Sequence, residues 1–538
     1  MVWLLLLAAG AVHALSFSPD PLPGWALPYV QVLAMAVPAY LVLGTRDIRR
    51  AALSAFVFST SSFCVGVYWL YISMNHFGGL AAPLAALAVL LFSLYLSLYA
   101  ALAGACTAWV GRGLNFLCAP SALVRCLLWA AAWTLGEWLR GFVFTGFPWN
   151  NIGYAHTNSL LSAWAPIWGV YGVAFLAALA SALTASIFHF LKHNRPGIIA
   201  VMASALLGMF LVSLAVSRID WFDRQGPAMT VRLVQGNIPQ QMKFDPSQLM
   251  SSLQQQFALA SRPSVDVHHT PSLIVFPETI LPTFQDRMAP EFWQSVVELA
   301  DQMNATLFMG SPMHTIEQGK DRYTNSVLSI DRNTSVTALM QAQDVPVYDK
   351  RHLVPFGEFV PFGFRWFVDA LSIPLGDFDR GSQGQKSFVV DSQLFAPNIC
   401  YEDVFGEELL PALRTQADGS PGASVLFNVS NLGWFGNTWA LRQHLQIARM
   451  RSMETARPMI RATNTGTTAA IDAKGLVLAE LPTAKADVLD VQIQGTQGLT
   501  LYARVGNWLI VIVSVLVLLC GYLVKRNRSR NDASGEAA

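Results

Sequence analysis

The sequence predicts two folded parts: an α-helical transmembrane bundle and a large extracytoplasmic domain built from alternating strands and helices. Of the 538 residues, 53% are hydrophobic and only 13% are charged, whereas a soluble protein carries about 25% charged residues. The apolar residues gather in long runs towards both ends of the chain. The polar stretch 218–504 between them is long enough to bury its own core.

Eight apolar runs are candidates for crossing a bilayer, which takes about 20 residues in a helix. No Lys or Arg precedes the first run, so it lacks the charged start of a cleavable signal peptide, and we expect it to stay as a helix. The fourth and sixth runs are long, which favours tilted or re-entrant helices. The runs are 1–16, 26–44, 51–73, 79–110, 119–138, 160–191, 197–217 and 505–524.

Clusters of Arg and Lys predict the orientation, because these residues gather on the cytoplasmic side of a membrane. With the amino terminus inside, all four clusters fall on the cytoplasmic side, and 74–78, 139–159 and 218–504 lie outside. Both termini are then cytoplasmic, and an odd number of spans would break this agreement. The clusters are Arg46, Arg49 and Arg50; Arg112 and Arg125; Lys192 and Arg195; and Lys525, Arg526, Arg528 and Arg530.

The predicted domains follow from these assignments: a bundle of seven helices (1–217), the extracytoplasmic domain (218–504), a closing transmembrane helix (505–524) and a cytoplasmic basic tail (525–538). Inside 218–504, short strand patterns alternate with helical stretches, which predicts an α/β or layered α-β-α arrangement. The expected strands are 229–235, 272–276, 305–310, 387–396 and 423–428, and the expected helices are 291–303 and 438–456.

Cys400 is the only cysteine in the polar region. It has no intrachain disulfide partner there, and a free thiol in an oxidising compartment is a liability unless it is used. A small buried hydrophobe is the commoner role of a lone cysteine, but clusters around Glu278 and Lys350 favour a nucleophile. The other five cysteines, Cys64, Cys106, Cys118, Cys126 and Cys520, lie in or beside apolar runs.

Three short motifs offer a carboxylate, an amine and a thiol. A thiol is only slightly ionised at neutral pH and needs a base or a cation to become a good nucleophile. Glu278 could take the proton, and Lys350 could stabilise both the thiolate and the oxyanion formed when a carbonyl is attacked. His352 lies two residues from Lys350 on a strand or loop and would point the other way, so we expect a structural role for it. The motifs are Phe276-Pro277-Glu278-Thr279, 348–358 and Asn398-Ile399-Cys400-Tyr401-Glu402.

Glu278, Lys350 and Cys400, in this order and context, resemble the Glu-Lys-Cys triad of the nitrilase, or carbon–nitrogen hydrolase, superfamily, whose domains fold as an α-β-β-α sandwich. The added membrane spans, with two further motifs, resemble the apolipoprotein N-acyltransferase family, and the similarity covers nearly the whole chain. Phe276 stands where that family often has Trp, a departure that affects packing rather than chemistry. The further motifs are Gly146-Phe147-Pro148-Trp149 and Val354-Pro355-Phe356-Gly357-Glu358.

The resemblance implies an acyltransferase of lipoprotein maturation. The acyl chain of a membrane phospholipid, with phosphatidylethanolamine as the expected donor, would pass to Cys400 as a thioester. It would then move to the α-amine of a diacylglyceryl-cysteine at the start of an apolipoprotein. The protein would be a multi-pass protein of the bacterial inner membrane, with its catalytic domain on the periplasmic side.

Several residues near the triad are further candidates. By the resemblance, Glu358 would orient Lys350, with a solvated surface acid as the alternative. Tyr401 would offer its backbone N–H to the oxyanion, and Glu402 would either join the site or begin a helix. The aromatic segment 356–378 is expected to be a lid that dips into the headgroups, or else a core loop. Aromatic candidates for substrate binding, which could equally be core, are Phe244, Trp149, Trp434 and Phe435.

Other function classes fit the sequence less well. The net charge of +1 and the lack of a basic stripe argue against nucleic acid. No metal-ligand spacing or phosphate-binding Gly loop is present, so we expect neither metal nor cofactor. A membrane-tethered amidase or nitrilase with the same triad is the first alternative; it would release free fatty acid from phospholipid. A transporter or membrane binding protein is the second, and its activity would survive loss of Cys400.

Overall fold

The computed structural model describes the chain except residues 21, 244, 265–269, 369–376, 416–418 and 536–538, and only the backbone of 528–535. The chain divides into two compact units. The first, here called the helical unit, comprises 1–68, 83–220 and 504–538, and the second, the α/β unit, comprises 69–82 and 221–503.

Helices occupy all eight apolar runs, but not all of them are long and apolar enough to span a membrane. Five meet that condition among the described residues, and a sixth is added if Ile48–Gly66 and Trp69–Phe77 count as one bent span. The helical unit therefore holds several membrane-spanning helices. Its helices are α1 (Val2–Ala14), α2 (Leu27–Gly44), α3 (Ile48–Gly66), α5 (Ala82–Val110), α6 (Ala119–Arg140), α7 (Ala165–Lys192), α8 (Pro196–Val216) and α17 (Trp508–Gly535).

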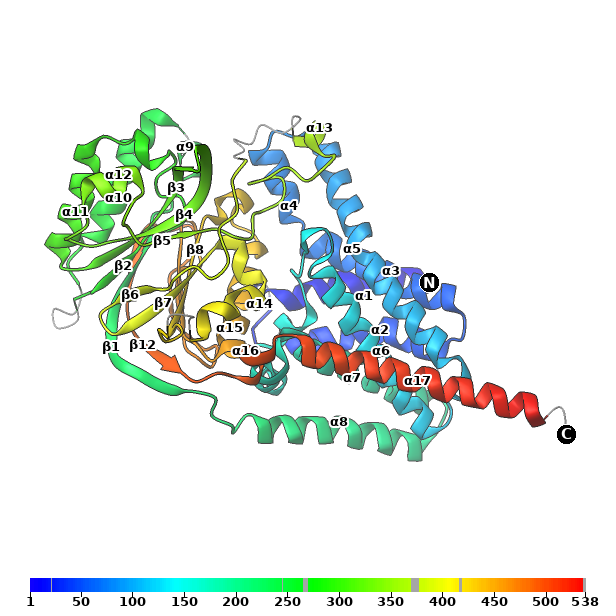
Figure 1. Cartoon of the computed structure of the whole chain (residues 1–538). Helices are drawn as coiled ribbons and strands as arrows, with labels where there is room; N and C mark the ends of the chain where they lie inside the picture. The colour runs from blue at the N-terminus through cyan, green and yellow to red at the C-terminus, as the bar shows by residue number, and fades with distance from the viewer. Residues whose placement is uncertain (21, 244, 265–269, 369–376, 416–418, 536–538) are drawn as a thin grey trace. The chain divides into compact units, whose positions relative to one another are not determined.

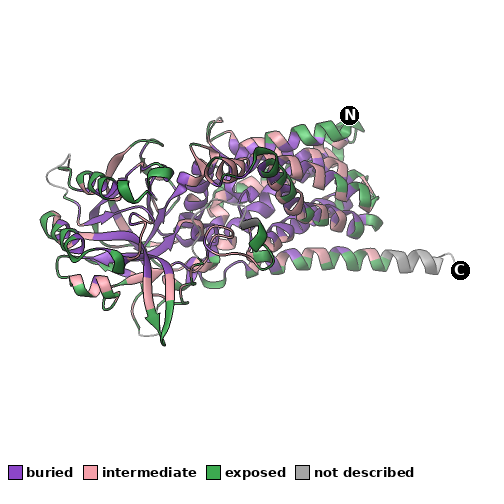
Figure 2. Cartoon of the chain, turned by 90° about the horizontal axis from the view of Figure 1, so that it is seen from above, coloured by how far each residue is buried: buried purple, intermediate pink, exposed green. Residues whose placement is uncertain are grey.

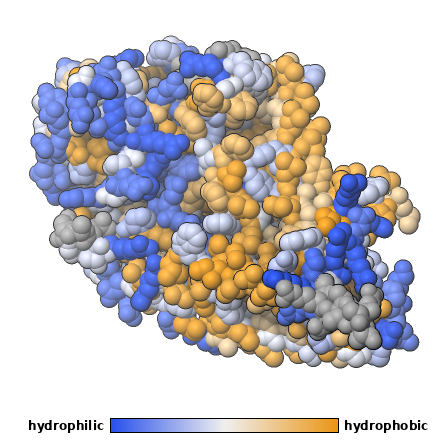
Figure 3. All heavy atoms as spheres, turned by 45° about the vertical axis from the view of Figure 1, so that its right-hand side comes forward, coloured by the Kyte–Doolittle hydropathy of each residue, from blue (hydrophilic) through white to orange (hydrophobic). Residues whose placement is uncertain are grey.

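Two of the predicted spans, α1 and α6, do not meet the condition of length and hydropathy, each for a physical reason. The 13 residues of α1 rise about 20 Å at about 1.5 Å per residue, less than the roughly 30 Å of a hydrocarbon core. Arg125, Glu137 and Arg140 lower the hydropathy of α6, and all three are buried inside the unit. The outward surface is nevertheless apolar (Figure 3), as lipid contact requires, with exposed Leu91, Leu102, Leu207, Leu211 and Leu516 among its residues.

The closing helix differs in its ends from the predicted span 505–524. Gly506 takes a positive φ of 62° and separates a short helix, α16 (Leu501–Val505), from α17, which begins at Trp508. Glycine suits this break because a side chain disfavours the left-handed region. At its other end α17 continues to Gly535, and no Pro or Gly interrupts it between Gly521 and that residue.

Residues 69–82, which the sequence assigns to the end of the apolar run 51–73, the gap 74–78 and the start of the run 79–110, belong instead to the α/β unit. They form α4 (Trp69–Ile72) and the π-helical turn η2 (Ser73–Phe77). The Trp69 indole donates to Gln443 Oε1 at 3.0 Å and its ring lies edge-on to Phe435. Phe77 lies edge-on to Trp434. These aromatic contacts explain why the segment belongs to the α/β unit although part of it lies in an apolar run.

The α/β unit contains two six-stranded sheets (Figure 1). Their strand orders are β12-β1-β2-β3-β4-β5 and β11-β10-β9-β8-β7-β6, with β1-β2-β3 and β7-β8-β9 parallel at the two centres. The strands are β1 (Asp223–Gln235), β2 (Leu273–Val275), β3 (Thr306–Glu317), β4 (Lys320–Ile330), β5 (Val347–Asp349), β6 (Phe388–Val390), β7 (Gln393–Ile399), β8 (Val425–Ser430), β9 (Met459–Thr463), β10 (Ala469–Ile471), β11 (Val477–Glu480) and β12 (Asp487–Gln497).

The two sheets pack face to face and helices cover their outer faces, which confirms the α-β-β-α sandwich. One apolar core joins the sheets, and the strands are buried along much of their length (Figure 2). A second core lies under α10 (Leu249–Ala260), α11 (Pro290–Met303) and α12 (Val336–Gln341), and a third under α14 (Gly406–Leu409), α15 (Trp439–Thr455) and α16. Two short helices, α9 (Gln240–Lys243) and α13 (Arg365–Val368), complete the unit.

Phe308 lies at the centre of the core between the sheets, and Phe308→Ala is expected to destabilise the α/β unit by about 3–5 kcal/mol. Its ring contacts the rings of Phe388, Phe395 and Phe427 on the facing sheet, and it has no exposed surface. Thermal unfolding in detergent, followed by tryptophan fluorescence, measures the loss. Val389→Ala on the edge strand β6, where Val389 is 64% exposed, is the control; equal shifts of the two variants would contradict the assigned core.

Candidate active site

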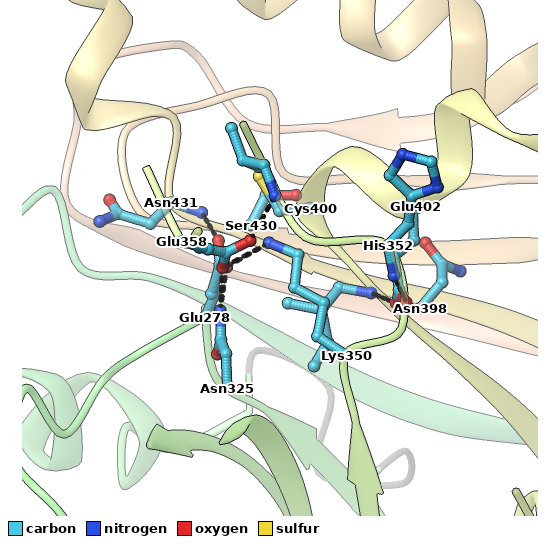
Figure 4. A network of polar contacts seen from close by, with 12 residues as sticks. Glu278, Asn325, Lys350, His352, Glu358, Asn398, Cys400, Glu402, Ser430 and Asn431 are labelled. Atoms are coloured by element: carbon cyan, nitrogen blue, oxygen red, sulfur yellow. Dashed lines mark hydrogen bonds and ion pairs between the residues drawn. The ribbon is translucent and has the colours of Figure 1, made fainter. Parts of the chain in front are cut away.

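Three segments that are distant in sequence bring two carboxylates and an amine into one buried cluster (Figure 4). Lys350 Nζ lies 2.8 Å from Glu358 Oε1 and 3.3 Å from Glu278 Oε1. Asn325 Nδ2 donates to both of these oxygens, at 2.8 Å to Glu278 and 2.7 Å to Glu358. All four side chains are buried. Glu358 is therefore a direct partner of the Lys350 ammonium and not a solvated surface acid.

The main chain around Glu278 is shaped to present its carboxyl group. Glu278 follows β2, and the next residue, Thr279, takes a positive φ of 50° that turns the chain. Gly310 on β3 passes beneath this turn, where a Cβ would lie 2.7 Å from Thr279 N and 2.9 Å from Glu278 Cα. Only glycine allows so close an approach. The second carboxylate oxygen, Oε2, accepts the backbone N–H of Asn431 at 2.8 Å.

Cys400 begins a 3₁₀ turn (Cys400–Val404) directly after the central strand β7. It has a positive φ of 53°, a strained conformation for a residue with a side chain. Its carbonyl oxygen accepts from Asn428 Nδ2 on the neighbouring strand β8 at 3.1 Å. In Figure 4 its side chain lies next to the carboxylates and the Lys350 amine. The end of a central strand thus places the thiol at the cluster, as expected for α/β folds.

The electrostatics of the cluster favour a resting thiol rather than a thiolate. Burial raises the pKa of Cys400 well above its usual value, as does Glu278, while Lys350 opposes them. Burial also tends to raise the pKa of Glu278, but Lys350, Asn325 and the Asn431 N–H outweigh it and hold that pKa below its usual value. Burial tends to lower the pKa of Lys350, but Glu278 and Glu358 raise it above its usual value. Lys350 therefore stays charged and Glu278 is ready to accept a proton.

Glu402 ties the thiol segment to the amine segment. Its Oε2 accepts the N–H of Ile399 at 2.7 Å, and its Oε1 accepts the N–H of Arg351 at 2.6 Å. Burial raises the pKa of Glu402 to about 7, and these backbone N–H groups oppose that rise. Both oxygens also lie 3.1 Å from the Tyr348 hydroxyl. Glu402 thus joins the site as a brace between the residues that flank Cys400 and Lys350.

Glu402→Gln is expected to slow the acyl transfer that the resemblance implies by about 10- to 100-fold, because the nucleophile and the amine would be misplaced. A Gln side chain has one acceptor oxygen, so its NH₂ would face a backbone N–H and leave it unpaired, at a cost of about 1–3 kcal/mol. Steady-state transfer and thermal unfolding measure the two effects. Glu407→Gln, at an exposed position in the same segment, is the control; wild-type turnover by Glu402→Gln would show that the brace is unimportant.

The other predicted site residues lie in different parts of the structure. His352 turns to Glu408 Oε1 at 2.9 Å and stacks on Phe405, while Tyr401 packs edge-on against Phe405. Trp434 and Phe435 lie in the turn after Asn431 and contact Phe77 and Trp69. Trp149 is buried in the helical unit, where its carbonyl oxygen accepts from Arg140 at 2.7 Å. Phe244 and residues 369–376 of the expected lid lie outside the described residues.

Sequence reasoning missed several polar residues of the site. Asn325 and Asn431 each donate to Glu278, and Lys243 donates to its main-chain oxygen at 2.9 Å. Isolated amides within strand and turn patterns carry no signal of this kind. Behind Cys400 lies a buried group in which His444 Nε2 is 2.6 Å from Asp403 Oδ1 and His444 Nδ1 is 3.0 Å from Arg461. In the sequence, the acidic pair Glu402-Asp403, which follows Cys400 after Tyr401, is the only sign of this group.

Two family models match the chain over the two parts described above. Residues 9–183 match the apolipoprotein N-acyltransferase N-terminal domain, and residues 230–500 match the carbon–nitrogen hydrolase family. The second match covers the sandwich and all three groups of the cluster.

Curated relatives match the chain over nearly its whole length. An apolipoprotein N-acyltransferase of Bordetella bronchiseptica is 50% identical over 94% of this chain and 93% of the relative. The corresponding proteins of Ralstonia nicotianae and Haemophilus influenzae are 41% and 33% identical, covering 97% and 96% of this chain and 92% and 94% of their own lengths. The chain therefore belongs to the apolipoprotein N-acyltransferase family.

Proposed function

We propose that this protein transfers an acyl chain from a membrane phospholipid to the N-terminal amine of a diacylglyceryl apolipoprotein, with Glu278, Lys350 and Cys400 as its catalytic triad. The observation that carries the proposal is the meeting of these three groups, from three distant segments, in one buried cluster. A base, a fixed cation and a thiol are the parts that covalent acyl transfer needs.

In the first half-reaction Cys400 takes the acyl group. Glu278 accepts the thiol proton as sulfur attacks the ester carbonyl carbon, and the carbonyl oxygen becomes an oxyanion beside Lys350 and the Tyr401 N–H. Because the pKa of the Cys400 thiol is raised and that of Glu278 is lowered, we infer that proton transfer accompanies attack instead of preceding it. Collapse breaks the ester C–O bond, and the lysophospholipid alkoxide takes the proton from Glu278.

In the second half-reaction the neutral α-amine of the apolipoprotein attacks the thioester carbonyl. Glu278 accepts a proton from the amine nitrogen, the C–S bond breaks, and the Cys400 thiolate regains that proton. Converting an ester to a thioester is nearly isoenergetic and converting a thioester to an amide is downhill. No nucleotide is consumed, which suits a reaction outside the cytoplasm.

The proposed reaction takes place at the membrane, because its acyl donor is a phospholipid that stays in the bilayer. Lifting an acyl chain of about 16 carbons into water costs on the order of 10 kcal/mol, at ~0.8 kcal/mol per CH₂. We infer an inner-membrane protein in which eight apolar helices, the short α1 and the less apolar α6 included, cross the membrane. Both termini would lie in the cytoplasm and the α/β unit on the periplasmic side, where it acts on phosphatidylethanolamine. The apolar outward surface of the helices and the distribution of Arg and Lys support this placement.

Aromatic residues would hold the acyl chain. Phe362 and Trp366 of the predicted lid are 103% and 69% exposed, which supports contact with lipid rather than core packing. Trp434 and Phe435 follow Asn431, the residue that donates to Glu278, so they are suited to line the acyl path. We assign substrate binding to them, to Trp149 and to Phe244.

Intact mass spectrometry tests the chemistry directly. After incubation with phosphatidylethanolamine, the protein should gain the mass of one fatty acyl group, mapped to Cys400 and removed by a diacylated lipopeptide. Steady release of free fatty acid without lipopeptide would favour the hydrolase and overturn the transferase. Labelling of Leu476→Cys, an exposed site on the α/β unit, by an impermeant maleimide in spheroplasts tests the orientation; protection of that cysteine would overturn it.

A further inference from the structure

Lys243 is a buried lysine beside the base. It ends the short helix α9 and is only 7% exposed. Its Nζ donates to the main-chain oxygen of Glu278 at 2.9 Å. It also lines a small cavity together with Glu278, Gln256 and Asn464. A buried ammonium costs free energy unless nearby groups repay it, so its presence requires a reason beyond packing.

The helix that carries Lys243 is anchored to the site by polar contacts. Gln240 Oε1, one turn earlier, accepts from Asn431 Nδ2 at 3.1 Å, and Asn431 donates its backbone N–H to Glu278. Asn464 Oδ1 accepts the N–H of Ile238 at 2.9 Å, and Asn464 Nδ2 donates to the Ile238 carbonyl oxygen at 2.8 Å. These contacts fix both the start of α9 and its position against the base. Lys243 is therefore held beside Glu278 by a dedicated network.

Lys243 adds positive charge to a site that holds several carboxylates. Glu278, Glu358 and Asp403 raise the pKa of the Cys400 thiol, and Glu402, two residues after Cys400, is also buried. Lys350, Arg461 and Lys243 are cations that interact with the thiol. Loss of Lys243 would leave more of the negative charge uncompensated, which opposes formation of the thiolate.

Lys243 interacts electrostatically with both ends of the proton transfer, Glu278 and Cys400. When the proton moves from sulfur to the carboxylate, negative charge moves the other way, and this cation remains near it throughout. Its hydrogen bond also holds the Glu278 carbonyl just before Thr279, the residue with positive φ. Lys243 thus stabilises the strained turn at Thr279 and also adds positive charge to the site.

We propose that Lys243 is a positioning residue of the acyl-transfer site, which fixes the main chain of the base and supplies a further cation for the Cys400 thiolate. The inference rests on the proposed triad. Burial lowers the pKa of Lys243 to about 8, against the opposing effects of Glu278 and Cys400. The amine is therefore charged at pH 7, and its support for the thiolate fades as the pH rises through about 8.

The test compares the pH dependence of Cys400 alkylation by iodoacetamide in Lys243→Met, Lys243→Arg and wild type, read by mass spectrometry in the full-length protein in detergent. At pH 7, where Lys243 is charged, Lys243→Met should slow alkylation by about tenfold, the equivalent of one pKa unit, and the difference from wild type should shrink as the pH rises through about 8. Lys243→Arg should return the profile towards wild type. Single-turnover acylation from phosphatidylethanolamine should slow by about tenfold in Lys243→Met, since one pKa unit is a tenfold change in equilibrium.

Matched controls show whether an effect comes from the lost charge or from misfolding. A separate criterion distinguishes failure of this inference from failure of the proposed function. Lys485→Met removes an exposed lysine and Met242→Ala alters an exposed neighbour on α9, and both should leave the profile unchanged. A Lys243→Met profile that superimposes on wild type overturns the inference. If Lys243→Met does not fold, Lys243→Gln takes its place under the same criterion. If wild type forms no acyl adduct on Cys400, the proposed function fails, whatever the alkylation profiles show.

Discussion

Cys400→Ala should abolish acyl transfer, with a loss of at least about 10⁴-fold, because no other group can form the covalent intermediate. The protein should also gain no acyl mass from phosphatidylethanolamine. Cys400 is packed at the end of β7 and loses only a sulfur atom in this variant, so the fold should persist. Turnover of a diacylated lipopeptide and intact mass spectrometry measure the two losses.

Cys520→Ser is the matched control for this prediction. Cys520 is an exposed cysteine in α17, and its replacement should leave transfer intact. Cys400→Ser should be nearly as inactive as Cys400→Ala, since a serine hydroxyl is far less acidic than a thiol. Retained transfer in either Cys400 variant would exclude a covalent route through this residue.

Glu278→Gln should slow both half-reactions by about 10²- to 10⁴-fold, the usual contribution of a general base. The amide cannot accept the thiol proton or the amine proton. It also cannot satisfy all its neighbours, because Lys350 and Asn325 donate to one oxygen and Asn431 donates to the other. Rapid-mixing measurements of Cys400 acylation, and of thioester loss on addition of lipopeptide, give the two rates separately.

Glu298→Gln serves as the control, since Glu298 is an exposed residue of α11. If Glu278→Gln slows only thioester loss, another group must deprotonate the thiol. If it slows neither step, the base is elsewhere and the proposed triad is wrong. Thermal unfolding of each variant shows whether a slower reaction results from loss of the folded structure.

The strand pattern of the α/β unit was readable from the sequence because apolar side chains mark buried strands. The patterns at 229–235, 272–276, 305–310 and 423–428 correspond to β1, β2, β3 and β8. The pattern at 387–396 became a hairpin, β6 and β7, because Asp391 turns the chain with a positive φ of 52°. Pairing between strands depends on contacts across the fold, so the order within each sheet had no local signal.

Hydropathy identified the apolar helices but did not fix how many span the membrane. It registers only the average composition of a segment, so it could not tell that Arg125, Glu137 and Arg140 of α6 are buried inside the unit. It also could not assign Trp69 and Phe77 to the α/β unit, because their partners Phe435 and Trp434 lie more than 350 residues away.

By itself the sequence determined the three groups proposed to react, an acid at 278, an amine at 350 and a sulfur at 400, because each stands in a short motif that can be recognised without a fold. The tertiary structure alone decided their environment. It placed Glu358 and Glu402, both already candidates from the sequence, against the amine and across the two loops. It also brought in Asn325, Asn431 and Lys243, which the sequence did not indicate. These contacts depend on distances between segments that are remote in the chain, and such distances arise only when the two sheets pack.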